Sequence, residues 1–89
     1  RTRVLVLGLL PRGADARDPS RPVHTRINQI LARCADGRDV FFFDAGSILT
    51  DAAGNLSEHV AWDRVHLTFV GYALLSAAIE PSVRRLLPP

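Results

Sequence analysis

The sequence lacks the residues and segments that mark several classes of protein. It has one cysteine, Cys34, so an internal disulfide is impossible. A single cysteine does not identify the cellular compartment, and we slightly favour a secreted location over a cytoplasmic one. No apolar run approaches the roughly 20 residues that a membrane helix needs, and no signal peptide is visible. Repeats and internal linkers are absent too, so we expect a single domain and no membrane span.

Lysine is also absent, since all eleven basic residues are arginine. We attribute this to coding bias in a GC-rich genome. The arginines are spread along the chain and form no basic stripe interleaved with aromatic residues, so no nucleic-acid partner is expected. The formal net charge of +2 says little about other partners.

The chain is near the lower limit of what folds alone, with 89 residues. It begins at Arg1 rather than at a methionine. We therefore expect a processed product or a fragment, from which a targeting signal can have been lost.

Two short apolar runs, Arg3–Leu10 and Asp39–Asp44, have the pattern of strands buried on both faces of a parallel sheet. Apolar residues at helical spacing between them predict a helix over about Arg21–Ala35. Ser20 is its expected N-cap, and Gly37 can take the left-handed C′ position. Strand, helix and strand within about 40 residues predict a βαβ unit.

The second half of the chain reads as a loop followed by a helix. Ala45–Ser57 is expected to be an irregular connection, and Ser57 can cap a short helical turn at about Glu58–Trp62. Thr68 is the predicted N-cap of the last helix. Pro81 should kink that helix or open a second segment.

This set of elements is too small to cover its own sheet. Strands buried on both faces need neighbours and helices on both sides, and only two helices of useful length are predicted. We therefore expect an α/β fold in which this chain is half of a larger domain, completed by another polypeptide. The alternative is a small two-stranded domain, or an obligate homodimer that completes its own sheet.

A candidate site lies in the Trp62–Thr68 segment, which we place beyond the carboxyl ends of the strands. A carboxylate that accepts from Nδ1–H holds an imidazole in one tautomer and stabilises the imidazolium that forms. The hypothesis is that Asp63 orients His66, which acts first as a general base and then as a general acid. The alternative is that Asp63 caps a turn or pairs with Arg64, and that His66 is an ordinary boundary histidine.

A metal site is a further hypothesis. His59, Asp63 and His66 fall at i, i+4 and i+7, with Glu58 nearby, and such ligands suit zinc. Thr68 and the strand-like breaks indicate, however, that no helix runs through His66, so we assign no metal to the site.

Other polar residues are assigned structural or solvated roles. We expect His24 to be solvated and Cys34 to be buried and inert on the apolar stripe of its helix. Asp44 reads as a turn or cap residue, and Arg12 as a solvated loop residue.

Several segments together resemble a known family. DRVHLTFVGY (63–72) resembles the last conserved block of the SGNH (GDSL-type) hydrolases, in which D-x-x-H supplies two members of a Ser-His-Asp triad. VLVLGLLPRGAD (4–15), INQIL (27–31) and FFFDAGSILTDAAGNLS (41–57) resemble the platelet-activating-factor acetylhydrolase catalytic-subunit branch. The resemblance runs almost end to end and in the right order.

The resemblance implies a flavodoxin-like three-layer α/β/α sandwich with a mainly parallel sheet, of which residues 1–89 are the C-terminal part. It implies hydrolysis of short acyl esters, with acetyl the best candidate, and no cofactor. His66 would be the base and Asp63 its orienting residue.

The nucleophilic Ser of the Gly-Asp-Ser motif is absent, as are the Gly and Asn of the family's oxyanion hole. Asn28 is not that Asn, and Ser20, Ser47 and Ser57 lack the motif. The expected partner is an N-terminal fragment or complementary chain that carries Gly-Asp-Ser, and this chain alone should be inactive. The rival reading is a non-catalytic remnant that binds a partner through its open sheet edge.

Overall fold

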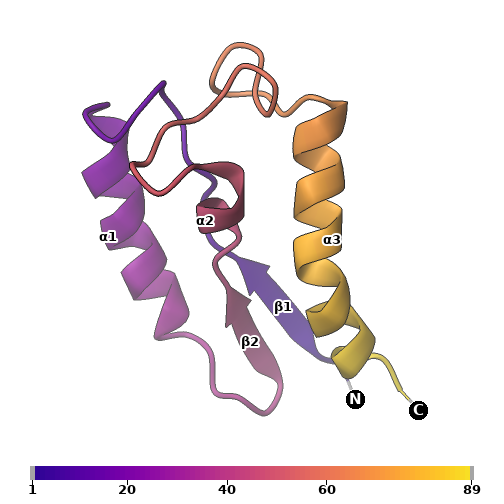
Figure 1. Ribbon diagram of the computed structural model, residues 1–89. Helices are drawn as coiled ribbons and strands as arrows, with labels where there is room; N and C mark the ends of the chain where they lie inside the picture. The colour runs from indigo at the N-terminus through magenta and orange to yellow at the C-terminus, as the bar shows by residue number, and fades with distance from the viewer. Residues whose placement is uncertain (1, 89) are drawn as a thin grey trace.

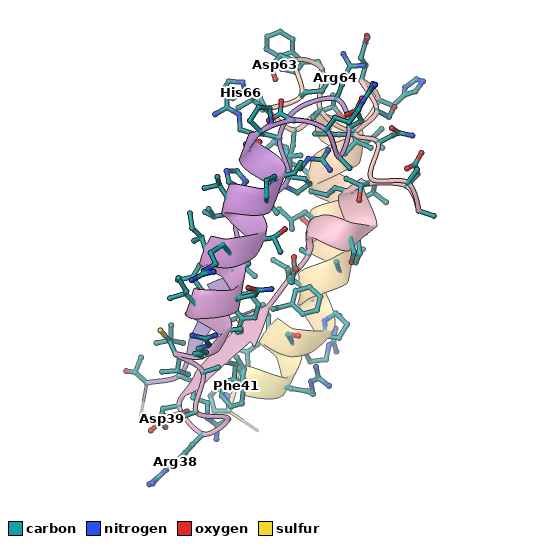
Figure 2. All side chains as sticks on the ribbon, turned by 90° about the vertical axis from the view of Figure 1, so that its left-hand side faces the viewer. Arg38, Asp39, Phe41, Asp63, Arg64 and His66 are labelled. Carbon is teal, nitrogen blue, oxygen red and sulfur yellow. The ribbon has the colours of Figure 1, made fainter. Side chains whose placement is uncertain are left out.

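The computed structural model describes residues 2–88. The chain forms β1 (Val4–Leu7), α1 (Ser20–Ala32), β2 (Val40–Phe43), α2 (Gly46–Leu49) and α3 (Phe69–Leu86). Figures 1 and 2 show α1 and α3 on opposite sides of the two strands. Within residues 2–88, no helix has both the length and the apolar character needed to cross a membrane.

The two strands form a parallel pair, which confirms the predicted βαβ unit. Val4 lies opposite Val40, and the register continues to Leu7 opposite Phe43. Both strands are shorter than their apolar runs. After Leu7 the amide of Gly8 still donates to the Phe43 carbonyl at 3.0 Å, but the chain then leaves the sheet. The predicted α/β class is therefore confirmed at the level of a small unit with a two-stranded sheet.

The strands are not buried on both faces by residues 2–88, since every residue of β2 remains half-buried. The buried core is small and lies beyond the carboxyl ends of the strands. Its contiguous cluster consists of Leu49, Leu56 and Ala61, and the half-buried Leu10, Val60 and Leu67 pack against this cluster. The loops that follow the strands are thus the best-packed part of the chain.

Helix α1 differs from the prediction at both ends. Pro19 rather than Ser20 occupies the N-cap position, and the hydroxyl and N–H of Ser20 both donate to the carboxylate of Asp18. The helix ends at Ala32, three residues early. Gly37 does adopt a left-handed φ of 72°, but in the turn before β2, where its amide donates to the Val40 carbonyl.

The predicted burial of the α1 stripe is wrong for the described chain. No residue of α1 is buried, and Cys34, expected to be inert in a core, is exposed. The helix is amphipathic, but too few of the described residues lie against its apolar stripe to cover it.

Helix α3 begins as predicted. The Thr68 hydroxyl accepts from the Gly71 amide at 3.1 Å, which confirms Thr68 as the N-cap. The helix then continues through Pro81 to Leu86, so the alternative of a second segment is wrong. Pro81, which is exposed, removes one intrahelical N–H.

The connection after β2 is more ordered than the sequence indicates. It contains α2, whose Leu49 is 3% exposed and belongs to the core. A four-residue helix is too short to show a helical period, so the pattern could not predict it. Ser57 does cap the following turn, since its hydroxyl accepts from the His59 amide at 3.0 Å.

Candidate functional site

The loop from Ala61 to Leu67 holds the candidate site. It is closed by an isolated antiparallel bridge between these two residues, both of which pack in the core. The loop lies at the end of the molecule toward which the strands run, and Figure 2 shows Asp63, Arg64 and His66 gathered there. This is the edge at which open parallel sheets carry their functional residues.

Asp63 and His66 are in direct contact. Nδ1 of His66 lies 2.7 Å from Oδ2 of Asp63. The other carboxylate oxygen, Oδ1, accepts from the backbone amides of Val65 at 2.9 Å and His66 at 2.7 Å. The carboxylate therefore fixes the turn and the ring at the same time. The expected pair is present, and its catalytic role stays a prediction.

The electrostatics of the pair follow from these bonds. The His66 backbone amide, then the His66 ring and the Val65 amide, lower the pKa of Asp63 from 3.8 to about 2. Asp63 is therefore ionised at neutral pH, so Nδ1–H donates to it and Nε2 of the neutral ring carries the free lone pair. Within residues 2–88 no hydrogen bond reaches Nε2, and the His66 side chain is 71% exposed. The ring can accept a proton from a group that approaches its outer face.

Of the alternative for Asp63, the turn cap is observed, but the pairing with Arg64 is not. Nη1 of Arg64 lies 3.2 Å from the Glu58 carboxylate, and its Nε donates to the Leu56 carbonyl at 3.2 Å. Its backbone has a left-handed φ of 60°, a conformation that costs a non-glycine residue about 1–2 kcal/mol. The carbonyl of Arg64 accepts from Gly13 at 3.0 Å. These contacts explain how the turn between Asp63 and His66 is held.

The loop after β1 is tied to the same region. The guanidinium of Arg21 donates to the carbonyls of Arg12 and Gly13, and the Leu56 amide donates to the Ala14 carbonyl at 2.8 Å. Backbone hydrogen bonds thus join the loop after β1 to the two loop segments that contain Leu56 and Arg64.

Two residues of α1 hold the chain as it leaves β1. The Asn28 side chain accepts from the Leu9 amide at 2.6 Å and donates to the Leu9 carbonyl at 3.1 Å. His24, predicted to be solvated, is half-buried, with Nδ1 3.1 Å from the Leu10 carbonyl. That prediction is wrong because the loop after β1 folds back over the first turn of α1. Asp44 accepts from the Gly46 amide at 3.0 Å, which confirms its turn role.

The metal hypothesis finds no support in the geometry. In the part of the chain that the structure describes, no three or more His, Cys, Asp or Glu side chains are grouped so that they could hold a metal ion. His59 lies in a turn rather than on a helix shared with Asp63 and His66. The i, i+4, i+7 spacing therefore does not bring the three side chains together.

The three serines that lack the Gly-Asp-Ser motif are not partners of His66 within the described residues. Ser20 donates to Asp18, and Ser57 caps the turn at His59. Ser47 lies on α2 and is exposed. None of the three is hydrogen-bonded to His66 among the contacts of residues 2–88.

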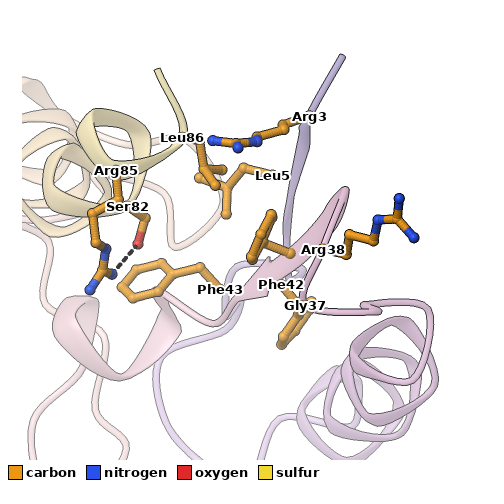
Figure 3. A pocket seen from close by; sticks show the side chains of 10 residues that line it. Arg3, Leu5, Gly37, Arg38, Phe42, Phe43, Ser82, Arg85 and Leu86 are labelled. Atoms are coloured by element: carbon orange, nitrogen blue, oxygen red, sulfur yellow. Dashed lines mark hydrogen bonds between the residues drawn. The ribbon is translucent and has the colours of Figure 1, made fainter. Parts of the chain in front are cut away.

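A separate cavity of about 590 Å³ lies near the start of the strands and the end of α3 (Figure 3). Three phenylalanines of β2 line it, together with arginine side chains from three segments: Phe41, Phe42, Phe43, Arg3, Arg38 and Arg85. Figure 2 shows Arg38 and Phe41 at the end of the molecule opposite His66. The cavity is therefore distinct from the Asp63–His66 site.

Trp62 and Arg64 are site residues that sequence reasoning missed. The indole of Trp62 stacks on the His66 ring, with centroids 6.1 Å apart and planes inclined by 17°. Its position directly before Asp63 in the sequence could have indicated that it lies near the His66 ring. The left-handed backbone of Arg64 had no such signal, because arginine rarely adopts that conformation.

The fold and the site define a class: an α/β protein with an Asp-held histidine beyond the carboxyl ends of parallel strands. No protein-family model matches the chain. Over 86 residues it is 35% identical to platelet-activating factor acetylhydrolase IB subunit alpha1 of Bos taurus and 31% identical to subunit alpha2 of Homo sapiens. Each match covers 96% of this chain and 37% of the relative, so the chain spans little more than a third of these proteins.

A solved structure from Streptococcus pneumonia, whose name refers to platelet-activating factor, has the same fold. It superposes with a TM-score of 0.76 at 25% sequence identity, over 92% of this chain and 42% of that one. The chain belongs to the SGNH-like family of these acetylhydrolase subunits and corresponds to its C-terminal portion.

Proposed function

We propose that this chain supplies the general base and its orienting carboxylate to a serine ester hydrolase of the SGNH type. The observation that carries the proposal is the 2.7 Å contact between Asp63 Oδ2 and His66 Nδ1. It leaves Nε2, the proton acceptor, on the open side of the loop. The names of the relatives, acetylhydrolase subunits, support the reaction class.

In the proposed mechanism a serine hydroxyl attacks the acyl carbon, and Nε2 of His66 takes its proton. Asp63 remains ionised and stabilises the imidazolium. His66 then gives the proton to the departing alkoxide, which leaves as the alcohol, and an acyl-serine remains. His66 next removes a proton from water as the water oxygen adds to the acyl carbon. The bond between the acyl carbon and the serine oxygen then breaks, His66 returns the proton to that oxygen, and the acid is released.

The serine and the oxyanion donors come from residues outside these 89. The sequence contains no Gly-Asp-Ser, and the chain spans 37% of the bovine relative. We assign them to an N-terminal fragment or complementary chain. Each missing oxyanion donor is worth about 10²–10³ in rate, so this chain alone should be inactive.

The same partner would complete the sheet. Residues 1–89 are then the C-terminal part of a single three-layer α/β/α domain with a mainly parallel sheet. The exposed apolar residues support this proposal: Val23, Ile27 and Ile30, which recur at helical spacing on α1, are 55%, 36% and 50% exposed. Apolar surface of this extent is typical of an interface.

The proposed substrate is an ester of a short acyl group, with acetyl the first candidate. The proposal of acetyl rests on the names of the relatives. The exposed Nε2 side of His66 fits a substrate that binds between this loop and the partner, so acyl selectivity depends on the partner's loops as well.

The test uses p-nitrophenyl acetate and the protein assembled with its N-terminal part. We expect His66→Ala to lower kcat by about a thousandfold or more, because it removes the base. Asp63→Asn should cost less, because the imidazole itself remains, although the asparagine nitrogen facing Nδ1 disfavours the tautomer in which Nε2 is the acceptor. His59→Ala is the matched control and should retain activity, because His59 is exposed and its hydrogen bonds within residues 2–88 come from its backbone amide and carbonyl, not from its ring.

Wild-type turnover in His66→Ala would show that the pair is not the base. An assembled protein with no esterase activity in any form would favour the non-catalytic interaction module instead.

A further inference from the structure

The bridge between Ala61 and Leu67 determines which side chains meet in the loop. Ala61 is 1% exposed, and Leu67 packs against the core. In an antiparallel arrangement the next residue on each strand points to the opposite side. Trp62 and His66 are those next residues, so both rings point outward together.

The contact between the rings is a stack. Their centroids lie 6.1 Å apart and their planes are 17° from parallel. This is within the 4.5–7 Å typical of aromatic pairs, and about the distance at which an indole attracts a cation. The indole is thus nearly parallel to the imidazole and offset from it, while Asp63 holds its Nδ1 edge.

Core packing does not explain this tryptophan. Trp62 is 63% exposed and is not part of the buried cluster of Leu49, Leu56 and Ala61. Among the contacts described for residues 2–88, its ring meets the His66 ring. The indole therefore acts through its contact with the His66 ring.

The charged surroundings of His66 are simple. Asp63 is the carboxylate in contact with it. The guanidinium of Arg64, next in the loop, is bonded to Glu58 and to the Leu56 carbonyl, and so does not approach the ring. An imidazolium at this position has one carboxylate at its edge and one indole at its face.

We propose that Trp62 is a positioning residue that stabilises the imidazolium of His66. The inference rests on the proposed function, in which that imidazolium forms as the serine loses its proton. Because a ring quadrupole attracts a cation and not a neutral ring, the indole favours the charged state of His66 selectively. Its effect should therefore appear in kcat rather than in substrate binding.

The test compares Trp62→Leu with Trp62→Phe in the assembled enzyme. For Trp62→Leu we expect kcat to fall about two- to fivefold with KM unchanged, and the acid limb of log(kcat/KM) against pH to move about 0.4–0.7 unit lower. Trp62→Phe keeps a weaker ring quadrupole and should fall between Leu and wild type. An unchanged acid limb in Trp62→Leu, or a rise in KM alone, would overturn the proposal; the latter would make Trp62 a wall of the substrate site.

A second readout does not depend on catalysis. Trp62 is the only tryptophan in this chain, and an imidazolium quenches a stacked indole by excited-state electron transfer. The emission of Trp62, obtained by subtracting that of Trp62→Phe, should fall as the pH is lowered through the range in which histidine titrates. The step should vanish in His66→Gln and persist in His59→Gln.

A step that survives His66→Gln would show that the two rings do not stack in solution, and would overturn the proposal whatever the enzyme's activity. Loss of the step together with full turnover in His66→Ala would instead retain the stack and reject the proposed function on which the inference rests.

Discussion

The two oxygens of the Asp63 carboxylate have different tasks. Oδ1 accepts two backbone amides and fixes the turn, while Oδ2 accepts from the His66 ring. An asparagine could perform the first task but not the second together with it, because its nitrogen donates instead of accepting. A single residue thus couples the shape of the loop to the tautomer of the base.

The lowered pKa of Asp63 predicts a pH-dependent contribution to stability. A carboxyl whose pKa falls from 3.8 to about 2 on folding stabilises the fold at pH values above its pKa in the unfolded chain. This stabilisation is lost as the pH falls toward 2. The difference in free energy of unfolding between wild type and Asp63→Asn should therefore shrink from about pH 5 to about pH 3. Urea unfolding of the assembled protein at several pH values measures it.

Asp15 and Asp36 also have a pKa lowered to about 2, through bonds from Arg17 and from backbone amides before β2 respectively. They are present in both proteins, so the difference isolates Asp63. A constant difference across this pH range would mean that the carboxylate does not hold the loop.

At the scale of elements, the start of α3 fixes the end of the loop. The Thr68 hydroxyl accepts from the Gly71 amide, and its single proton faces the carbonyls of His59 and Val60. Gly71 is buried, and a Cβ there would clash with the Val60 carbonyl. The helix therefore packs directly on the backbone of Val60, which precedes the site. Its N-cap, Thr68, follows His66 by two residues.

Thr68→Ala should lower the free energy of unfolding by about 1–2 kcal/mol, because it removes an N-cap and the hydroxyl proton that faces two loop carbonyls. Thr68→Ser keeps the hydroxyl and should remain within about 0.5 kcal/mol of wild type. Urea unfolding of the two variants measures both values. Equal losses in the two would assign the effect to the methyl group and not to the cap.

At the scale of the whole molecule, local signals were predictable and burial was not. The apolar runs predicted both strands, and the polar pattern at Asp63, His66 and Thr68 predicted the loop and the cap. Cys34 was misjudged because an amphipathic stripe shows which face is apolar, not whether anything covers it. The left-handed Arg64 depends on contacts with Leu56, Glu58 and Gly13, and the short helix α2 depends on the packing of Leu49 in the buried cluster. No local pattern contains these contacts.

The small core also belongs to this scale. Residues 2–88 bury few large side chains and leave both long helices with exposed apolar faces. The chain spans little more than a third of its curated relatives. We therefore expect its stability and its activity to depend on the same partner surface.

The most direct measurement of the central claim is covalent labelling of the assembled protein with a fluorophosphonate, followed by mass spectrometry of the peptides. The reagent phosphonylates a serine that an adjacent histidine has activated. The account predicts one adduct on a serine outside these 89 residues, strongly reduced in His66→Ala and unchanged in His59→Ala. An adduct on Ser20, Ser47 or Ser57, or labelling that does not depend on His66, would contradict it.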